Sequence, residues 1–332
     1  MNAIEHFEGA EQFFAICEQL KEKRVGILGH LRPDGDCLGA QVALHEILTT
    51  YGAKAFLGLS GENVPPNLRW IVHGYELVKP EIMAIDECIF VDCGVPSRAG
   101  DGVKFLPKPL ISIDHHISGE RFSRNNFFYP DAAATCEIIT DFLEQKAWKI
   151  SKHAASALYA GILTDTGKFS YSSTTARTLF LALQLVLKGA DPHQISVAIY
   201  QNEPREKFAL MRHFLASLRY YAAGKICVGQ LTEQDYLETH ATAEDTEGFV
   251  NMLCSIAGIQ IAVIAYAWEG KTRISLRCND PRLRLDRFAV KFSGGGHRCA
   301  VGFTVDSPYE KFEKIFIPAL EIHMEQNTQE HL

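Results

Sequence analysis

The stretch "GHLRPDGDCLGA", residues 29–40, places a histidine and two aspartates within seven positions of one another. It follows the apolar run "VGIL" and precedes the helical pattern "GAQVALHEILTTYG", so we expect it to form the loop between a strand and a helix. Pro33 and Gly35 bend such a loop, and the side chains of Asp34 and Asp36 can then point the same way. Two carboxylates this close repel each other unless a cation lies between them. The stretch therefore predicts a metal-ligand loop or, as the alternative, an Asx-rich turn that caps the helix.

Short apolar runs alternate with helical patterns from about residue 24 to residue 190. The runs are "VGIL", "KAFLGL", "ECIFVD" and "PLISIDHH", and the later helical patterns are "AAATCEIITDFLEQ" and "SKHAASALYAGILTD". This alternation predicts βαβ units around a mainly parallel, doubly wound sheet. Polar residues stand where the apolar runs end: His30, Asp92, Asp114, His115, His116 and Asp165. Because the carboxyl ends of parallel strands line the ligand crevice, we expect these segments to converge on one place.

The length of 332 residues favours two domains, since one domain usually has about 100–200 residues. We expect a first domain over residues 1–190 and a charged helical linker over 191–215, interrupted by Pro204. Beyond it, runs such as "KICVGQLT" and "IQIAVIAYAWEG" alternate with helical patterns, which predicts a smaller α/β domain over 216–326. The predicted fold is therefore α/β in both domains.

The cysteines and the first residues of the chain indicate the cellular compartment in which we expect the protein. The nine cysteines are odd in number and scattered, without a C-x-x-C pair, which argues against a disulfide framework and against a thiolate zinc site. The first residues lack the basic-then-apolar order of a signal peptide, and no run approaches the ~20 apolar residues of a membrane span. We therefore expect a cytoplasmic protein without a membrane partner.

The formal net charge of −7 disfavours a protein that coats long nucleic acid, because such binding relies on many Lys/Arg contacts to phosphates. A local exception is residues 271–298, with eight Lys/Arg against two Asp. There "FSGGGHR" offers Gly294, Gly295, Gly296 and His297, and three glycines let the backbone N–H groups approach an anion. Arg277 adds a planar, bidentate phosphate donor. A flexible glycine turn is the alternative reading of this motif.

The segment "SIDHHIS" ends an apolar run with an acid and two adjacent histidines, His115 and His116. A hydrogen-bonded histidine pair at the sheet end is the alternative to a functional role. With the aspartates, however, the set combines carboxylates and imidazoles without cysteine, which suits Mn²⁺, Mg²⁺ or Fe²⁺ better than structural zinc. The number of ligands predicts two divalent metal ions, most simply Mn²⁺. Two such ions can activate a bridging water, as a hydroxide, for in-line attack on phosphorus.

In order and wording, the motifs resemble the DHH phosphoesterase family with a DHH-associated domain, of the nanoRNase and 3′-phosphoadenosine-5′-phosphate phosphatase type. "GHLRPDGDCLGA" is similar to the first motif, "FVDCG" to the second, "IDHH" to the third and "GILTDTGKF" to the fourth. "SLRCN" and "GGGH" are similar to motifs of the associated domain. The resemblance covers nearly the whole chain and implies an active site in the cleft between the two domains.

The resemblance also implies roles for individual residues. One metal ion would be held by His30, Asp34 and Asp92, and the second by Asp36, Asp92, His115 and Asp165. Asp92 would bridge the two ions, His116 would contact the scissile phosphate, and Asp114 would orient the neighbouring imidazole. A further phosphate of the substrate would be bound by Arg277, Gly294, Gly295, Gly296 and His297.

The expected activity is hydrolysis of very short RNA oligonucleotides, with removal of the 3′-phosphate of 3′-phosphoadenosine-5′-phosphate as a further activity. A linear or cyclic dinucleotide phosphodiesterase is an alternative that would share every metal ligand. A non-catalytic nucleotide-binding module on the same fold is the alternative of another class, because fold alone does not establish activity. Long duplex nucleic acid is not an expected partner, and the sequence leaves open a homodimer.

Overall fold

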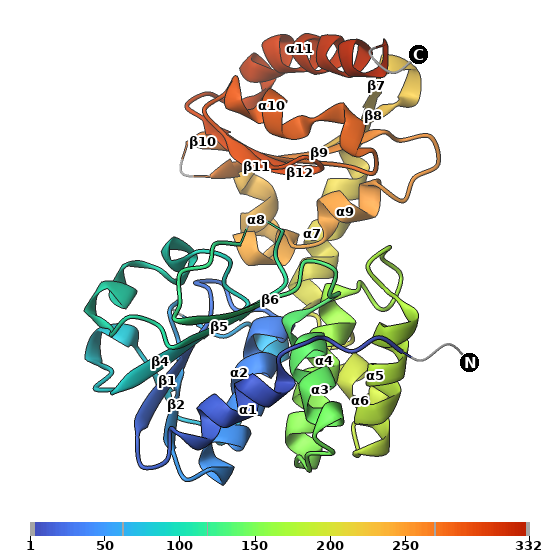
Figure 1. The fold of residues 1–332 in the computed structure, drawn as a ribbon. Helices are drawn as coiled ribbons and strands as arrows, with labels where there is room; N and C mark the ends of the chain where they lie inside the picture. The colour runs from blue at the N-terminus through green and yellow to red at the C-terminus, as the bar shows by residue number, and fades with distance from the viewer. Residues whose placement is uncertain (1–3, 62, 118, 269, 330–332) are drawn as a thin grey trace. The chain divides into compact units, whose positions relative to one another are not determined.

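The computed structural model describes residues 4–61, 63–117, 119–268 and 270–329. The chain divides into two compact units at the bond between Asn202 and Glu203 (Figure 1). Each unit combines one six-stranded sheet with helices, and the sheet of the first unit is parallel throughout. This architecture confirms the predicted class of a parallel α/β domain followed by a smaller α/β domain. Among the described helices, none has both the length and the apolar character that crossing a bilayer requires.

The strand order of the first sheet decides which loops become neighbours. Its strands are β1 (Arg24–Leu28), β2 (Lys54–Gly58), β3 (Leu77–Val78), β4 (Glu87–Val91), β5 (Ile111–Asp114) and β6 (Asn125–Phe128). They run in the order β3-β2-β1-β4-β5-β6, so β1, β4 and β5 are consecutive although long segments separate them in the sequence. Since all pairs are parallel, the loops that follow these three strands leave from the same edge.

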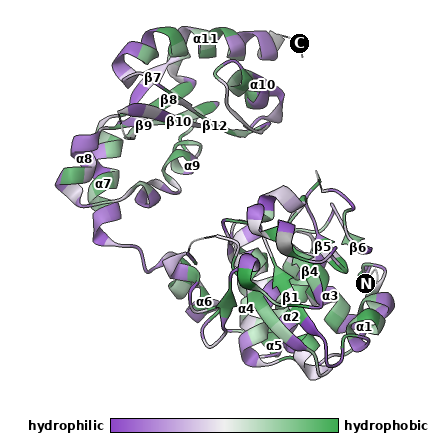
Figure 2. Cartoon of the chain, turned by 90° about the vertical axis from the view of Figure 1, so that its left-hand side faces the viewer, coloured by the Kyte–Doolittle hydropathy of each residue, from purple (hydrophilic) through white to green (hydrophobic). Residues whose placement is uncertain are grey.

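Both faces of this sheet are covered by apolar side chains. Successive side chains of a strand point to opposite faces, so neighbouring apolar residues belong to different core clusters. Ile27 of β1 and Ile89 of β4 belong to the main core cluster, whereas their neighbours Leu28 and Phe90 belong to a second, smaller cluster. The helices of this unit are α1 (Ala10–Glu18), α2 (Gly35–Thr50), α3 (Thr135–Gln145), α4 (Lys152–Asp165), α5 (Ala176–Leu187) and α6 (Pro192–Tyr200). Figure 2 shows α2 coloured as hydrophobic over most of its surface, in agreement with its burial among the other elements.

Helices α2 and α4 approach each other closely, and glycines make this approach possible. A Cβ atom at Gly39 would lie 2.4 Å from the carbonyl oxygen of Ala157, and one at Gly161 would lie 3.0 Å from the Cα atom of Asp36. Both distances are too short for a side chain without movement of the backbone. The close contact brings the first turn of α2 near the last turn of α4, which ends at Asp165.

The sheet of the second unit is mixed. Its strands are β7 (Arg219–Tyr221), β8 (Ile226–Leu231), β9 (Ile261–Trp268), β10 (Lys271–Cys278), β11 (Gly295–His297) and β12 (Ala300–Val305). The order is β11-β12-β10-β9-β8-β7, and only the β8–β9 pair is parallel among the described strands. The helices are α7 (Arg205–Ala216), α8 (Glu233–Thr239), α9 (Phe249–Leu253), α10 (Leu285–Val290) and α11 (Tyr309–Gln329). Two core clusters lie on opposite faces of this sheet, one with Phe288 and Phe316 and one with Phe214 and Phe249.

Candidate metal centre

The loop after β1 carries the first two candidate ligands, His30 and Asp34. Nε2 of His30 lies 3.6 Å from Oδ2 of Asp34, and the other carboxylate oxygen of Asp34 accepts a hydrogen bond of 3.0 Å from the backbone N–H of Cys37. Asp34 is therefore the N-cap of α2 and at the same time faces His30 with its second oxygen. The cap predicted as the alternative is confirmed, and the position of Asp34 beside His30 leaves the metal-ligand role a prediction for the same residue.

Asp36 lies in the first turn of α2 and is fully buried. Its two carboxylate oxygens accept hydrogen bonds from the backbone N–H groups of Thr135, at 2.7 Å, and Cys136, at 2.8 Å. Oδ2 of Asp36 also lies 3.9 Å from Nε2 of His115. These bonds fix the direction of a carboxylate that no solvent reaches.

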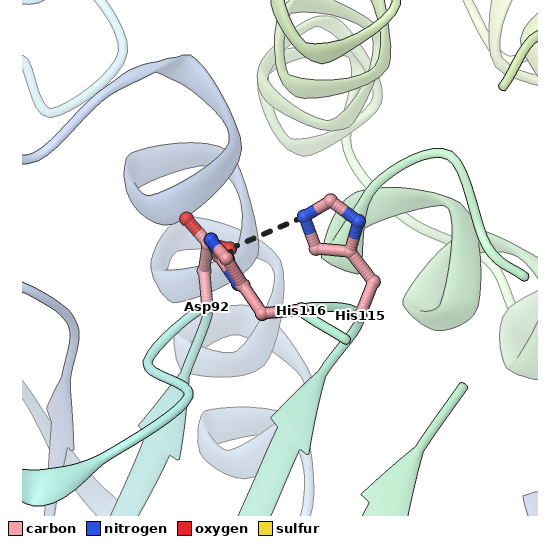
Figure 3. A group of neighbouring side chains, drawn as sticks. All are labelled: Asp92, His115 and His116. Atoms are coloured by element: carbon pink, nitrogen blue, oxygen red, sulfur yellow. Dashed lines mark ion pairs between the residues drawn. The ribbon is translucent and has the colours of Figure 1, made fainter. Parts of the chain in front are cut away.

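Asp92 follows β4 and is 2% exposed. Its Oδ2 lies 3.2 Å from Nε2 of His30, and its Oδ1 lies 3.6 Å from Nε2 of His115 and 3.4 Å from Nδ1 of His116. Figure 3 shows the carboxylate at the end of one strand and both imidazoles on the loop that follows the neighbouring strand. The backbone φ of Asp92 is 51°, a left-handed conformation that is uncommon outside glycine and typical of functional positions.

His115 and His116 are adjacent in the sequence but make hydrogen bonds to different acceptors. Nδ1 of His115 donates to the carbonyl oxygen of Ala132 at 3.3 Å, while Nε2 lies 3.1 Å from Oδ2 of Asp165 at the end of α4. Nδ1 of His116 donates instead to Oδ1 of Asp114 at 2.8 Å. Asp114 thus orients His116, whereas a backbone carbonyl orients His115.

The charges of this cluster shift the protonation of its members. Burial and the charges of Asp92 and Asp165 raise the pKa of Asp36 well above its ordinary value. Burial acts to raise the pKa of Asp92 as well, but the imidazoles of His115 and His30 outweigh it and hold that pKa below the usual range. Burial raises the pKa of Asp165 too, although its ion pair with His115 opposes the rise. Burial and the mutual repulsion of the carboxylates therefore favour positive charge in this cluster, which protonated imidazoles or divalent cations can supply.

The donor set fits divalent metal ions. Three groups of side chains each offer ligand atoms within 4.8 Å of one another: His30, Asp34 and Asp92; Asp36, His115 and Asp165; and Asp92, His115 and His116. Nε2 of His115 is buried and makes no hydrogen bond with any residue in the described ranges, despite its short distance to Asp165. A buried nitrogen without a hydrogen-bond partner among carboxylates is the arrangement expected of a ligand atom directed at a shared cation.

Residue types and their spacing do not indicate one part of this site, the backbone groups around α3. The turn that leads into α3 supplies the backbone N–H groups of Thr135 and Cys136 and the carbonyl of Ala132, and Oγ1 of Thr135 lies 3.4 Å from Oδ1 of Asp92. Backbone groups are present at every residue, so no residue type marks them in advance. The run of small residues in "AAATC" is the only local feature that could have indicated a close approach of the backbone.

The residues predicted to bind the substrate's further phosphate lie in the second unit. Arg277 of β10 pairs with Ala300 of β12, and Ala300 pairs with His297 of β11, so the three positions form one row across three strands. The backbone of His297 is described, but its side chain lies outside the described part of the structure. Burial lowers the pKa of the Arg277 guanidinium.

The three glycines before His297 differ in what surrounds them. A Cβ atom at Gly294 would lie 2.5 Å from Cβ of Phe303, and one at Gly296 would lie 2.3 Å from the carbonyl oxygen of Ala300. A Cβ atom at Gly295 would meet no described atom within 4 Å. Close packing of the β11–β12 hairpin therefore accounts for two of the glycines, and Gly295 alone faces open space.

The fold and the site define a class: a two-domain α/β protein with a buried carboxylate–imidazole centre at the carboxyl edge of a parallel sheet. The model of the DHH family, N-terminal domain, matches residues 24–162, and the model of the DHHA1 domain matches residues 223–320. The chain belongs to the DHH family.

Curated relatives and a solved structure are similar over nearly the whole chain. A bifunctional oligoribonuclease and PAP phosphatase (NrnA) of Mycoplasma pneumoniae is 31% identical over 324 residues, which cover 92% of this chain and 95% of the relative. The protein of the same description from Thermus thermophilus is 28% identical over 312 residues, covering 91% of this chain and 92% of the relative. The crystal structure of an exopolyphosphatase-related protein from Bacteroides fragilis has a TM-score of 0.88 and 25% identity, with 99% of both chains covered.

Proposed function

We propose that this chain is a metal-dependent phosphoesterase that hydrolyses very short RNA oligonucleotides and removes the 3′-phosphate of 3′-phosphoadenosine-5′-phosphate (PAP). The observation that carries the proposal is the buried cluster around Asp92, in which carboxylates and imidazoles from the loops after β1, β4 and β5 and from the end of α4 lie within ion-pair distance. The activities named for the relatives from Mycoplasma pneumoniae and Thermus thermophilus support the choice of substrates.

Two Mn²⁺ ions are the proposed cofactors. His30, Asp34 and Asp92 would hold one ion, and Asp36, Asp92, His115 and Asp165 would hold the other, with Asp92 shared. When bound, such ions lower the pKa of a coordinated water and offset negative charge on the phosphoryl oxygens.

The protein's own groups position the substrate. Because Nδ1 of His116 donates a hydrogen bond to Asp114, Nε2 is the ring nitrogen available to a substrate. In the imidazolium form, with both nitrogens protonated, Nε2 would donate to a nonbridging oxygen of the scissile phosphate. The side chain of His116 is 27% exposed, whereas that of Asp92 is 3% exposed, so a substrate can reach the imidazole. His116 is thus the proposed substrate-contacting residue of the centre.

A second phosphate contact would select short substrates. Arg277 and the backbone of Gly295 are the proposed donors, together with His297. Arg277 lies on β10 and the other two lie on β11, with β12 between these strands. The net charge of −7 provides no basic surface along which a long strand would bind.

Hydrolysis of a matched panel tests this proposal. The substrates are PAP, RNAs of two, five and 24 nucleotides, a cyclic dinucleotide, pyrophosphate and a short polyphosphate, each with Mn²⁺ and with chelator. We expect Mn²⁺-dependent turnover of PAP and of the two shorter RNAs. Cleavage of the cyclic dinucleotide alone, or of polyphosphate alone, would replace the proposed substrate class. No turnover of any substrate by folded, Mn²⁺-loaded protein would favour a non-catalytic nucleotide-binding module.

A further inference from the structure

Residues 132–136, which comprise the turn before α3 and the first two residues of that helix and are called the turn below, make hydrogen bonds to two of the candidate metal ligands. The carbonyl oxygen of Ala132 accepts from Nδ1 of His115 at 3.3 Å, and the N–H groups of Thr135 and Cys136 donate to Asp36 at 2.7 and 2.8 Å. A hydrogen bond at Nδ1 directs Nε2 of the same imidazole toward the cluster. The position of this turn therefore sets the direction of both Asp36 and His115.

A buried carboxylate holds the turn in place. Glu137, in the first turn of α3, has no solvent-exposed surface, and its Oε2 accepts a hydrogen bond of 2.5 Å from the backbone N–H of Ala133. Its Oε1 accepts from Oγ1 of Thr178 at 2.9 Å and from Nε of Arg177 at 3.4 Å, both on α5. The carboxylate thus connects the turn to a neighbouring helix.

Arg177 extends this connection to the beginning of the turn. Its Nη2 donates to the carbonyl oxygen of Asp131 at 3.3 Å and to the Asp131 carboxylate at 3.2 Å. The guanidinium also lies 3.7 Å from the centre of the Phe7 ring, which limits its movement. Glu137 and Arg177 together hold the backbone on both sides of Ala132.

The stability of the fold does not by itself explain why residue 137 is a glutamate and not an apolar residue. Burial of a charged group costs free energy that its hydrogen bonds offset only in part, and an apolar side chain would pack in a core without that cost. What an apolar side chain would not supply is an acceptor for the N–H of Ala133, which fixes the backbone next to the carbonyl that orients His115.

We infer that Glu137 is a positioning residue for the metal centre, holding the turn at residues 132–136 so that its backbone groups orient His115 and Asp36. The inference rests on the proposed function, in that the oriented side chains are the proposed ligands. Glu137 belongs to none of the candidate metal-binding groups, and it acts through the turn.

The same helix offers a matched control. Asp141, one turn further along α3, is also a fully buried carboxylate. It accepts from Nδ1 of His6 at 2.6 Å, from the N–H of Phe7 at 2.8 Å and from Nε2 of Gln145 at 2.9 Å. These bonds hold the N-terminal segment and involve no residue of the turn, so Asp141→Asn removes a comparable buried charge that makes no direct contact with the ligands or the turn.

The test compares the full chain with Glu137→Gln and Asp141→Asn. Mn²⁺ binding is measured without substrate by electron paramagnetic resonance, and melting temperature is measured in chelator. We expect Glu137→Gln to bind Mn²⁺ about 10–100-fold more weakly, the usual effect of losing support for a ligand. Both variants should melt lower than wild type, but Asp141→Asn should bind Mn²⁺ like wild type. At saturating Mn²⁺, KM of Glu137→Gln should approach the wild-type value.

Amide hydrogen exchange of residues 132–136 in the metal-free chain provides a readout that does not depend on metal. Exchange at Thr135 and Cys136 should be faster in Glu137→Gln and unchanged in Asp141→Asn. If wild type itself bound no Mn²⁺, the proposed function would fail, and this exchange comparison would still decide whether Glu137 holds the turn.

Two results would overturn the inference: wild-type Mn²⁺ affinity and amide protection in Glu137→Gln, or an equal loss of Mn²⁺ affinity in Asp141→Asn. If Glu137→Gln does not fold, Arg177→Gln replaces it, because Arg177 holds the same turn from a partly exposed position. A several-fold loss of Mn²⁺ affinity in Arg177→Gln would support the inference, and unchanged affinity would reject it.

Discussion

The Asp92 carboxylate lies 3.2 Å from Nε2 of His30 and so joins the loops that follow two adjacent parallel strands, β1 and β4. Asp92 reaches this position from a left-handed backbone with φ of 51°. Backbone strain of this kind persists only where surrounding contacts impose it, and here it coincides with the carboxylate that the proposed function places between both metal ions.

The first prediction concerns this carboxylate. Asp92→Asn keeps the shape of the side chain, and asparagine tolerates a positive φ, so the chain should fold. The amide cannot replace a charged ligand shared by two ions, and we expect Mn²⁺-dependent hydrolysis to fall more than ~100-fold, beyond the usual effect of changing a group around the ligands. The control is Asp86→Asn, since Asp86 accepts from the N–H of Arg24 at the other end of the same strands. Substantial turnover in Asp92→Asn would contradict the assignment.

The second prediction separates the two roles of Asp34. Asparagine is as good an N-cap as aspartate, so Asp34→Asn should keep the hydrogen bond to Cys37 and the wild-type melting temperature. It should nevertheless weaken Mn²⁺ binding, because an anionic ligand is lost. Asp34→Ala should weaken Mn²⁺ binding and also lower the free energy of unfolding by about 1 kcal/mol, through loss of the cap. Equal Mn²⁺ affinity in wild type and Asp34→Asn would leave Asp34 with the capping role alone.

The third prediction concerns pH. Burial acts to lower the pKa of His30, but Asp34 and Asp92 outweigh it and raise that pKa to about 10 in the metal-free chain. Burial opposes the rise at His115 as well, yet Asp165 and Asp92 raise its pKa to about 12. Both pKa values exceed the ordinary histidine value, so this contribution to stability is fully present below about pH 6.5 and is lost as the pH rises toward these values.

Metal ions compete with these protons. We therefore expect the affinity for Mn²⁺ to rise with pH above about pH 6.5, while the melting temperature in chelator falls over the same range. Calorimetric titration in buffers of different ionisation enthalpy measures the protons released on binding. Binding without proton release between pH 7 and pH 8 would contradict this prediction, because it would show that the metal replaces no proton on His30 or His115.

The fourth prediction uses Gly294 and Gly295 of the glycine run before His297. Gly295→Ala places a methyl group in open space, so the melting temperature should stay at the wild-type value, whereas the KM for PAP should rise if the backbone there contacts a phosphate. Gly294→Ala forces a methyl group against Cβ of Phe303 and should destabilise the fold by about 1–3 kcal/mol. An unchanged KM in Gly295→Ala would remove this glycine from the proposed phosphate site.

The pattern of residue types along the chain predicts the α/β class and the positions of the chemically distinctive residues. Apolar runs of strand length ending in His30, Asp92 and the pair His115–His116 predict side chains at the carboxyl edge of a parallel sheet, because every parallel strand ends at the same edge. Side-chain chemistry carries this information, since carboxylates and imidazoles are identifiable from residue type alone.

The tertiary structure decided which of these ends meet. The strand order makes β1, β4 and β5 neighbours, and Gly39 and Gly161 let α2 and α4 approach closely enough to bring Asp36 near Asp165. It also decided the contacts of the turn before α3 and the role of Glu137, which sequence reasoning placed only on a helix. Such contacts depend on backbone N–H and carbonyl groups and on the packing of distant segments. Backbone groups are the same in nearly every residue, and packing depends on the fold, so residue type and spacing do not predict these contacts.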